Sequence, residues 1–396
     1  MSGPLDGLRV LDLSRFIAGP HCGMLLGDLG ADVVKVERAQ IGEEARLMEP
    51  KLEGESYYLL VFNRNKRGIT LDFRNPRAQQ VLRELASKAD VLLENFRPGT
   101  LEKMGCGWDE LHALNPRLIM ARVSGFGQDG PDADRVCFDA IAQATSGLMD
   151  MTGSHSGPPT LSGTYLVDYS TALYTTIGVL AALEHRNRSG EGQLVDVALL
   201  DSAVSLLITA IAEHGATGAV TSRIGNEDRY AAPGNTFEAQ DGAWVHLIAG
   251  SDAHFPRILA AMARADLLAD PRFASVELRM VNRPAIEEVV AGWIGGLAAD
   301  AVVAALAEVG VPCARVATVA DVVTNRQLRH RGQIAEIDHP TVGTFSMQGL
   351  TVKLSDSPMS IRRPPPRLGE HCDEVLGEWL GYADGQIAEL RRDGVI

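Results

Sequence analysis

The sequence predicts an α/β protein with a large, Rossmann-like parallel-sheet domain and a smaller α+β domain. Short apolar runs of β type alternate with helical segments through the first half of the chain, which is typical of a doubly wound parallel sheet. Between residues 220 and 233, glycine and polar residues interrupt this alternation, and the pattern that follows is different. We therefore expect a domain boundary in that segment.

The first strand is expected at residues 8–13, and the first helix begins at Ala18-Gly19-Pro20, because proline suits the first turn of a helix. Gly30 ends this helix, and residues 32–38 form a buried strand that ends in charged residues. Further strands are expected at 68–73, 89–94, 118–124 and 193–199, with helices at 77–89 and 172–185.

The second half begins with a β-hairpin at residues 236–249, in which Asp241-Gly242 supplies the tight turn. Helices rich in Ala and Leu follow to about residue 309. Strands are expected at 345–347 and 350–354, and a helix is expected at 370–380.

The composition limits the classes of partner. The net charge is −14, and such an acidic chain is a poor non-specific binder of nucleic acid, which requires a basic surface. No run approaches the ~18 consecutive apolar residues of a membrane helix, and the first residues lack a basic, then apolar leader, so we expect a cytoplasmic protein. The five cysteines are scattered without Cys-x-x-Cys spacing, which predicts reduced thiols and no metal site.

A nicotinamide-dependent enzyme is a first alternative, because a strand ending in Glu37 suits a dinucleotide ribose. The fingerprint Gly-x-Gly-x-x-Gly is missing from the first turn, however, where bulky Phe16 and Ile17 stand instead. These side chains hinder the close approach of a pyrophosphate. Arg38, directly after the acid, suits a phosphate better than a ribose hydroxyl, so this alternative is disfavoured.

Blocks of sequence in a fixed order carry a resemblance that spans nearly the whole chain. They lie at residues 4–12, 18–20, 30–37, 65–72, 89–99, 162–168, 190–193 and 368–376. Together they resemble the class III coenzyme A (CoA) transferases, the group of formyl-CoA:oxalate and carnitine CoA transferases, with the α-methylacyl-CoA racemases as cousins. The resemblance implies a large CoA-binding domain at 1–220, a small domain at 221–325, a segment at 326–396 that returns to the large domain, and an interlocked homodimer.

Asp168 occupies the position of the family's catalytic aspartate. Its place before an apolar helix also fits a plain N-cap, because aspartate at a helix start accepts hydrogen bonds from free N–H groups. A transferase needs an ionised carboxylate to attack a thioester, and we expect helix N–H groups to keep the pKa of Asp168 near its ordinary value. The implied activity moves CoA from an acyl-CoA to a free carboxylic acid through aspartyl-anhydride and aspartyl-CoA intermediates. No metal and no permanently bound cofactor is expected.

The resemblance also implies a set of CoA-binding residues. They are Ile17, Ala18, Arg38, Leu71, Arg74, Asn95, Phe96, Arg97, Lys103, Phe138 and Asp139. Arg38 matches the family's phosphate-binding arginine, and guanidinium bonds phosphate through two N–H groups. For the charged members, the alternative is a solvated surface charge, and for Leu71 and Phe96 it is the hydrophobic core.

Two rival functions remain open. The racemases have a histidine where this chain has Phe138, and an aromatic hydrocarbon ring cannot act as a base, so a racemase is disfavoured. A catalytically silent CoA-binding homologue is the second rival. Oxalate is not favoured as the acceptor acid, because residues 225–234 lack the glycine run of oxalate enzymes and Val136 stands in place of their lysine.

Overall fold

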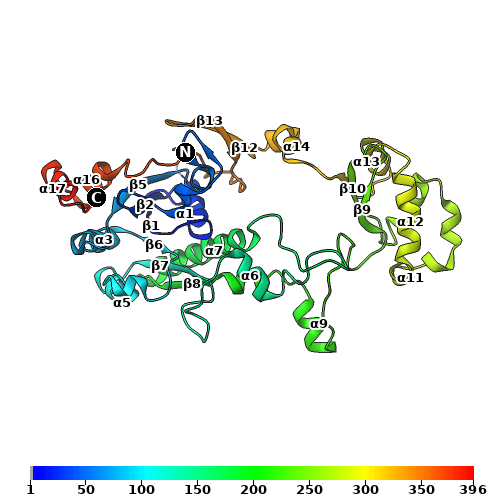
Figure 1. The fold of residues 1–396 in the computed structure, drawn as a ribbon, viewed down its shortest axis with the longest axis horizontal. Helices are drawn as coiled ribbons and strands as arrows, with labels where there is room; N and C mark the ends of the chain where they lie inside the picture. Colours follow the sequence, from blue (N-terminus) through cyan, green and yellow to red (C-terminus); the bar gives the residue numbers. More distant parts are fainter. Residues whose placement is uncertain (1–2) are drawn as a thin grey trace. The chain divides into compact units, whose positions relative to one another are not determined.

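The computed structural model describes residues 3–396, which divide into two compact units (Figure 1). The large unit comprises Met1–Leu148, Leu161–Glu213 and Gln327–Ile396, and the small unit comprises Met149–Thr160 and His214–Arg326. The segment Met149–Thr160 therefore belongs to the small unit, whereas the expected ranges assigned it to the large domain. Those ranges, 1–220, 221–325 and 326–396, stay predictions for domains that fold independently.

The large unit is built on a six-stranded sheet in which every neighbouring pair is parallel. Its strands are β1 (Arg9–Asp12), β2 (Asp32–Arg38), β5 (Lys66–Leu71), β6 (Val91–Glu94), β7 (Ile119–Ser124) and β8 (Leu194–Ala198). Their order is β5-β2-β1-β6-β7-β8, so the chain starts at the centre, runs to one edge and then returns to fill the other. The predicted doubly wound parallel sheet is confirmed.

Alternating side chains of the strands bury both faces of this sheet. Val10 packs in a core with helices α1 (Ala18–Asp28) and α7 (Leu166–Ser189). Leu11, the next residue, points to the other face, where α3 (Pro76–Lys88) and α16 (Cys372–Leu380) cover the sheet. Because both faces are covered, the middle of each strand is mainly apolar, and charged residues stand chiefly near the strand ends, as in Arg9-Val10-Leu11-Asp12.

The remaining elements of the large unit surround this framework. They are η1 (Glu44–Leu47), β3 (Lys51–Leu52), β4 (Glu55–Ser56), α2 (Tyr57–Phe62), α4 (Thr100–Lys103), α5 (Trp108–Leu114), α6 (Asp139–Ser146), α8 (Leu199–Val204), β12 (Ile334–His339), β13 (Gly343–Gln348) and α17 (Asp384–Arg392). Helices α9 (Ala210–Thr217) and α15 (Arg326–His330) cross the limits between the units. The strand predicted at 350–354 is wrong, because β13 pairs instead with β12, which the sequence reading missed.

The small unit has a three-stranded antiparallel sheet of β9 (Gly234–Glu238), β10 (Trp244–Ile248) and β11 (Cys313–Arg315). Strands β9 and β10 form the predicted hairpin. Short helices complete the unit: α10 (Phe255–Ala261), η2 (Ala265–Ala269), η3 (Pro271–Phe273), α11 (Val276–Val281), α12 (Arg283–Ile294), α13 (Ala299–Glu308) and α14 (Val319–Thr324). This mixture of antiparallel strands and helices confirms the α+β character of the second unit.

Helix α7 is long and apolar enough, by length and composition, to cross a membrane, although only 44% of its most apolar window is buried. Helices α12 and α13 pass the same test only as a pair, with a bend of 114° between them. The packing of α7 against α1 and the sheet is typical of a core helix, and its first turn carries the functional candidate Asp168.

Candidate active site

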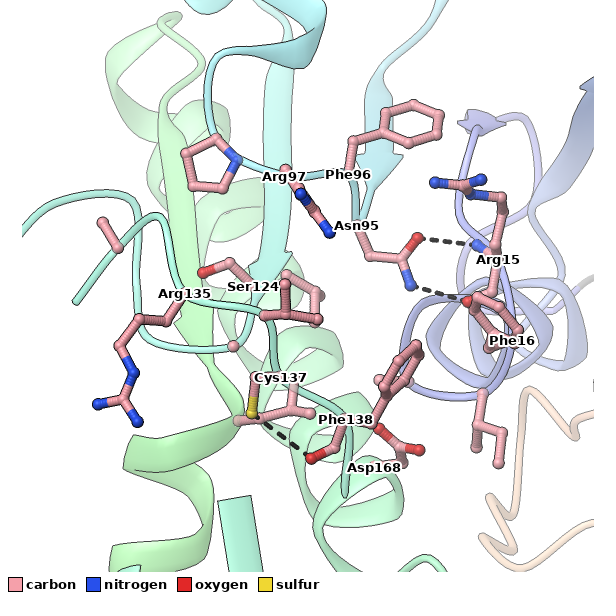
Figure 2. Close-up of a pocket in the computed structure, with 18 of the residues that line it drawn as sticks. Arg15, Phe16, Asn95, Phe96, Arg97, Ser124, Arg135, Cys137, Phe138 and Asp168 are labelled. Carbon is pink, nitrogen blue, oxygen red and sulfur yellow. Dashed lines mark hydrogen bonds between the residues drawn. The ribbon is translucent and has the colours of Figure 1, made fainter. Parts of the chain in front are cut away.

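The candidate site lies where the strand order of the large unit changes direction. Strands β1 and β6 are neighbours at the centre, and the chain leaves them toward opposite edges of the sheet. Ligands of open α/β sheets bind at such a switch point, beyond the carboxyl ends of the strands. A cavity of about 330 Å³ occurs there, lined by the segments that follow β1 and β6, the end of β7, the loop before α6, and the side chains of Asp168 and Leu199 (Figure 2).

Asn95 joins the two segments at the switch point. Its side-chain oxygen accepts from the backbone N–H of Arg15 at 2.8 Å, and its amide nitrogen donates to the backbone carbonyl of Arg15 at 2.7 Å (Figure 2). The next residue, Phe16, has a φ of 65°, and its N–H donates to the Glu43 carboxylate at 2.8 Å. These contacts fix the segment after β1, and the Phe16 ring meets the Phe138 ring edge-on at 5.7 Å.

Buried ion pairs lie beneath this segment. Lys66 donates to the Asp12 carboxylate at 2.8 Å, and both side chains are fully buried. Lys35 pairs with Glu43 at 2.6 Å and donates to the Ser14 carbonyl at 3.0 Å. Burial alone would raise the pKa of Asp12, but Lys66 and Lys35 lower it below its ordinary value. These two ion pairs therefore hold the segment after β1 in place, and none of their side chains lines the cavity.

Three arginines line the cavity: Arg15, Arg97 and Arg135. Arg15 lies 4.9 Å over the ring of Phe96 and donates to Glu44 at 3.0 Å. In a chain with a net charge of −14, this grouping gives one cavity a local excess of guanidinium, which suits phosphate. Arg15 and Arg135 are not among the residues predicted from the sequence, although they follow β1 and precede α6, where the switch-point rule places ligand-binding side chains.

Asp168 is the third residue of α7, and its side chain reaches the cavity beside Phe138 (Figure 2). The N-cap interpretation is therefore wrong, because Tyr165 holds that position. Burial, followed by the charge of Asp139, raises the pKa of Asp168 from its ordinary 3.8 to about 7. The expectation of an ordinary pKa is thus also wrong. At neutral pH, the carboxyl exists in both forms, and its ionised form is a stronger nucleophile than an ordinary aspartate would be.

Six of the eleven expected CoA-binding residues line the same cavity as Asp168. They are Ile17, Ala18, Asn95, Phe96, Arg97 and Phe138. They come from segments far apart in the sequence, which the carboxyl ends of β1 and β6 and the loop before α6 bring together.

The other five lie outside the lining. Arg38 donates to the Gly42 carbonyl at 3.1 Å and pairs with Glu44, which itself lines the cavity. Leu71 is fully buried in the core, so only its main chain could meet a ligand. The three remaining residues are placed as follows: Arg74 is exposed and pairs with Asp72, Lys103 is exposed at the end of α4, and Asp139 is buried at the start of α6.

A second, smaller cavity of about 200 Å³ shares Ile17 with the first. Aromatic side chains dominate its lining, and the hydroxyl of Tyr58 donates to that of Tyr165 at 2.8 Å. Tyr169, next to Asp168, also lines it and packs 4.8 Å from the ring of His21. Burial lowers the pKa of His21 to about 4, so this imidazole is neutral at physiological pH. Within residues 3–396, no group of three or more His, Cys, Asp or Glu side chains could hold a metal ion.

The fold and the site define a parallel α/β enzyme with a carboxylate and guanidinium groups in one pocket at the switch point. The family model of CoA-transferase family III matches residues 5–372. Two relatives from Chloroflexus aurantiacus each align with 99% of this chain and 98% of their own length: succinyl-CoA–D-citramalate CoA-transferase at 38% identity and the beta subunit of succinyl-CoA–L-malate CoA-transferase at 40%. A crystal structure of a CAIB/BAIF family protein from Brucella suis superposes with a TM-score of 0.86 and 35% identity, over 96% of this chain and 100% of that one. The chain therefore belongs to CoA-transferase family III, and the resemblance stated from the sequence is confirmed.

Proposed function

We propose that this enzyme moves CoA from an acyl-CoA thioester to a free dicarboxylic acid, with Asp168 as the covalent carrier. One observation supports this most strongly: the Asp168 carboxyl shares a cavity of about 330 Å³ with three arginines at the switch point of the sheet. The arginines suit the phosphates of CoA, and the carboxyl is the nucleophile that the chemistry requires. Both Chloroflexus relatives carry names that join succinyl-CoA to a dicarboxylic acid.

The proposed sequence retains the energy of the thioester throughout. An oxygen of ionised Asp168 attacks the donor carbonyl carbon, the carbon–sulfur bond breaks, and CoA leaves as the thiolate. The thiolate attacks the aspartyl carbonyl of the mixed anhydride, which releases the donor acid and leaves an aspartyl-CoA thioester. The acceptor carboxylate attacks this thioester, the carbon–sulfur bond breaks, and the CoA thiolate departs to leave a new mixed anhydride. The thiolate then attacks the acceptor acyl carbon of the anhydride and frees the Asp168 carboxylate. Each step exchanges one acyl bond for another, so ATP is not consumed.

The proposed CoA site keeps the whole expected set, with different parts for its members. Ile17, Ala18 and Phe138, which line the cavity, would meet the pantetheine end near Asp168, and Arg97 would bind a phosphate at the mouth of the site. Arg38, Arg74 and Lys103 would bind phosphates farther out, and Leu71 would contribute its main chain. Asn95 would act mainly by fixing Arg15, because its side-chain amide is already bonded to that residue at both ends.

The proposal includes an interlocked homodimer. Leu173, Ile177 and Leu180 follow one another at helical spacing on α7, so they share one face. They are exposed by 52%, 59% and 38%, respectively, in the isolated chain. An apolar face of this kind is typical of a surface that a partner subunit covers.

The test is an incubation of the enzyme with succinyl-CoA and a panel of mono- and dicarboxylic acids, followed by mass analysis of new CoA esters. The proposal expects a CoA ester of at least one dicarboxylate and none with the Asp168→Asn variant. Exchange of an α-proton with solvent in the absence of any acceptor acid would support a racemase instead. Binding of CoA without any new ester across the panel would support a silent homologue.

A further inference from the structure

Asp139 extends its side chain from the start of α6 to the first turn of α7. It is 3% exposed, and one carboxylate oxygen accepts from the backbone N–H of Val167 at 2.8 Å and of Asp168 at 3.0 Å. These N–H groups belong to the first turn of α7, where no intrahelical acceptor exists. The residue at the N-cap position, Tyr165, makes no side-chain capping bond. The helix that carries the nucleophile is thus capped by a carboxylate from another helix.

Gln143 completes this connection. Its amide nitrogen donates to the second oxygen of Asp139 at 2.5 Å, and its amide oxygen accepts from the backbone N–H of Ser162 at 3.0 Å. Gln143 is 1% exposed, so both members of the pair are enclosed. The network ties α6, the segment at Ser162 and the first turn of α7 to one another. The Asp139 carboxylate has three donors from the protein and does not line the cavity.

We infer that Asp139 is the positioning residue of the transferase: it takes the helix N–H groups for itself and leaves the Asp168 carboxyl unbonded and directed into the cavity. Within residues 3–396, no donor bonds the Asp168 carboxyl. A carboxylate held by helix N–H groups would be a weaker nucleophile, because those bonds stabilise the charge that must attack. The inference rests on the proposed function, in which Asp168 is that nucleophile.

Other titrating groups near Asp168 do not explain its ionisation. Burial, together with the charge of Asp168, raises the pKa of Cys137, in the loop before α6, to about 11. The hydrogen bond to Tyr165 is the main cause that raises the pKa of Tyr58, from α2, to about 12. From α1, His21 is neutral. Besides burial, the charge of Asp139 is the cause that raises the pKa of Asp168. Asp139 is therefore the charge whose removal should change the titration of Asp168 most.

The experiment measures the Asp168 carboxyl directly, in the full chain and without substrate. Infrared spectra of protein with isotope-labelled aspartate are recorded across pH, and the spectrum of the Asp168→Asn version of the same protein is subtracted. Asp139→Asn should lower the titration midpoint by about one pH unit, the shift expected when a neighbouring like charge is removed. The acid limb of the kcat/KM profile should move to lower pH by the same amount. A midpoint equal to that of the wild type would overturn the inference.

Two variants keep the result interpretable. In Asp139→Asn, the new amide nitrogen faces the amide nitrogen of Gln143, and the double variant Asp139→Asn/Gln143→Glu supplies an acceptor there again. The double variant should recover the melting temperature lost in the single variant. Its midpoint should lie between those of the single variant and the wild type, because the carboxylate introduced at position 143 restores a negative charge in the same network. Glu184→Gln is the control variant. Glu184 lies on the same helix as Asp168, about 24 Å along it at ~1.5 Å per residue, so this change should leave the midpoint of Asp168 unchanged. A role limited to folding would lower activity equally at every pH, without moving the midpoint. Because the titration is measured without substrate, its outcome does not depend on whether the enzyme transfers CoA. A failure of this inference can therefore be distinguished from a failure of the proposed function.

Discussion

Replacement of the nucleophile itself should stabilise the protein, and more so at high pH. The pKa of Asp168 is raised from 3.8 to about 7, so the folded state binds this proton more tightly than the unfolded state. Ionisation of Asp168 therefore lowers the free energy of unfolding as pH rises from 3.8 through 7, and this loss of stability reaches its full size above pH 7. Asp168→Asn is neutral at every pH and escapes the cost.

At ~1.4 kcal/mol per pKa unit, the cost is about 4 kcal/mol at pH 8 and about 2 kcal/mol at pH 5.5. The free energy of unfolding of Asp168→Asn, relative to the wild type, should thus be about 2 kcal/mol higher at pH 8 than at pH 5.5. Urea unfolding followed by circular dichroism at both pH values measures it, with Glu184→Gln as a control whose difference stays constant. An Asp168→Asn difference that is equal at both pH values, or larger at pH 5.5, would refute the raised pKa.

Three further predictions follow from contacts in the large unit. Asn95→Ala removes two hydrogen bonds to Arg15 and loosens the segment after β1, so kcat/KM should fall about tenfold. Calorimetry should show weaker CoA binding as well. Unchanged kcat/KM and CoA affinity would contradict the positioning role of Asn95. Lys66→Met leaves buried Asp12 without its nearest cation and should reduce the free energy of unfolding by about 3–5 kcal/mol. Urea unfolding measures this loss. A loss below ~1 kcal/mol would contradict a stabilising role of the ion pair. Ile177→Arg puts a charge on the exposed face of α7 and should convert the proposed dimer to monomers or aggregates in light scattering, whereas a dimer that forms normally in the variant would exclude that face from the interface.

The fold was largely predictable because its strands are buried on both faces. Residues 32–38, for example, form β2 with the bounds expected from the run of valines and the charged end. The pairing of β12 with β13 was missed. Residues 350–354 alternate apolar and polar side chains as β13 does, so they suggested a strand where none exists. The inclusion of Met149–Thr160 in the small unit depends on contacts between distant segments, for which a single sequence gives no signal.

Part of the cavity lining was predictable from the sequence, whereas the electrostatics of the site were not. Asp168 and the segment at 95–97 were selected by resemblance, and the structure places them around one cavity. The ordinary pKa expected for Asp168 was wrong, because the sequence could not show that this carboxyl is buried, or that Asp139, 29 residues earlier, brings its charge close to it and bonds the helix N–H groups. Spacing along the chain predicts which groups can bond within one helix, whereas this bond joins two helices that meet only after folding.

Direct capture of the covalent intermediate tests the central claim most closely. The enzyme is mixed with succinyl-CoA, quenched during turnover with hydroxylamine, digested, and analysed by peptide mass spectrometry. A hydroxamate should form on Asp168 alone. Its amount should rise with the concentration of succinyl-CoA, and none should form when free CoA replaces succinyl-CoA. Verified formation of a new CoA ester with Asp168 unmodified at every quench time would contradict the account, because the acyl group would then have moved without this carboxylate.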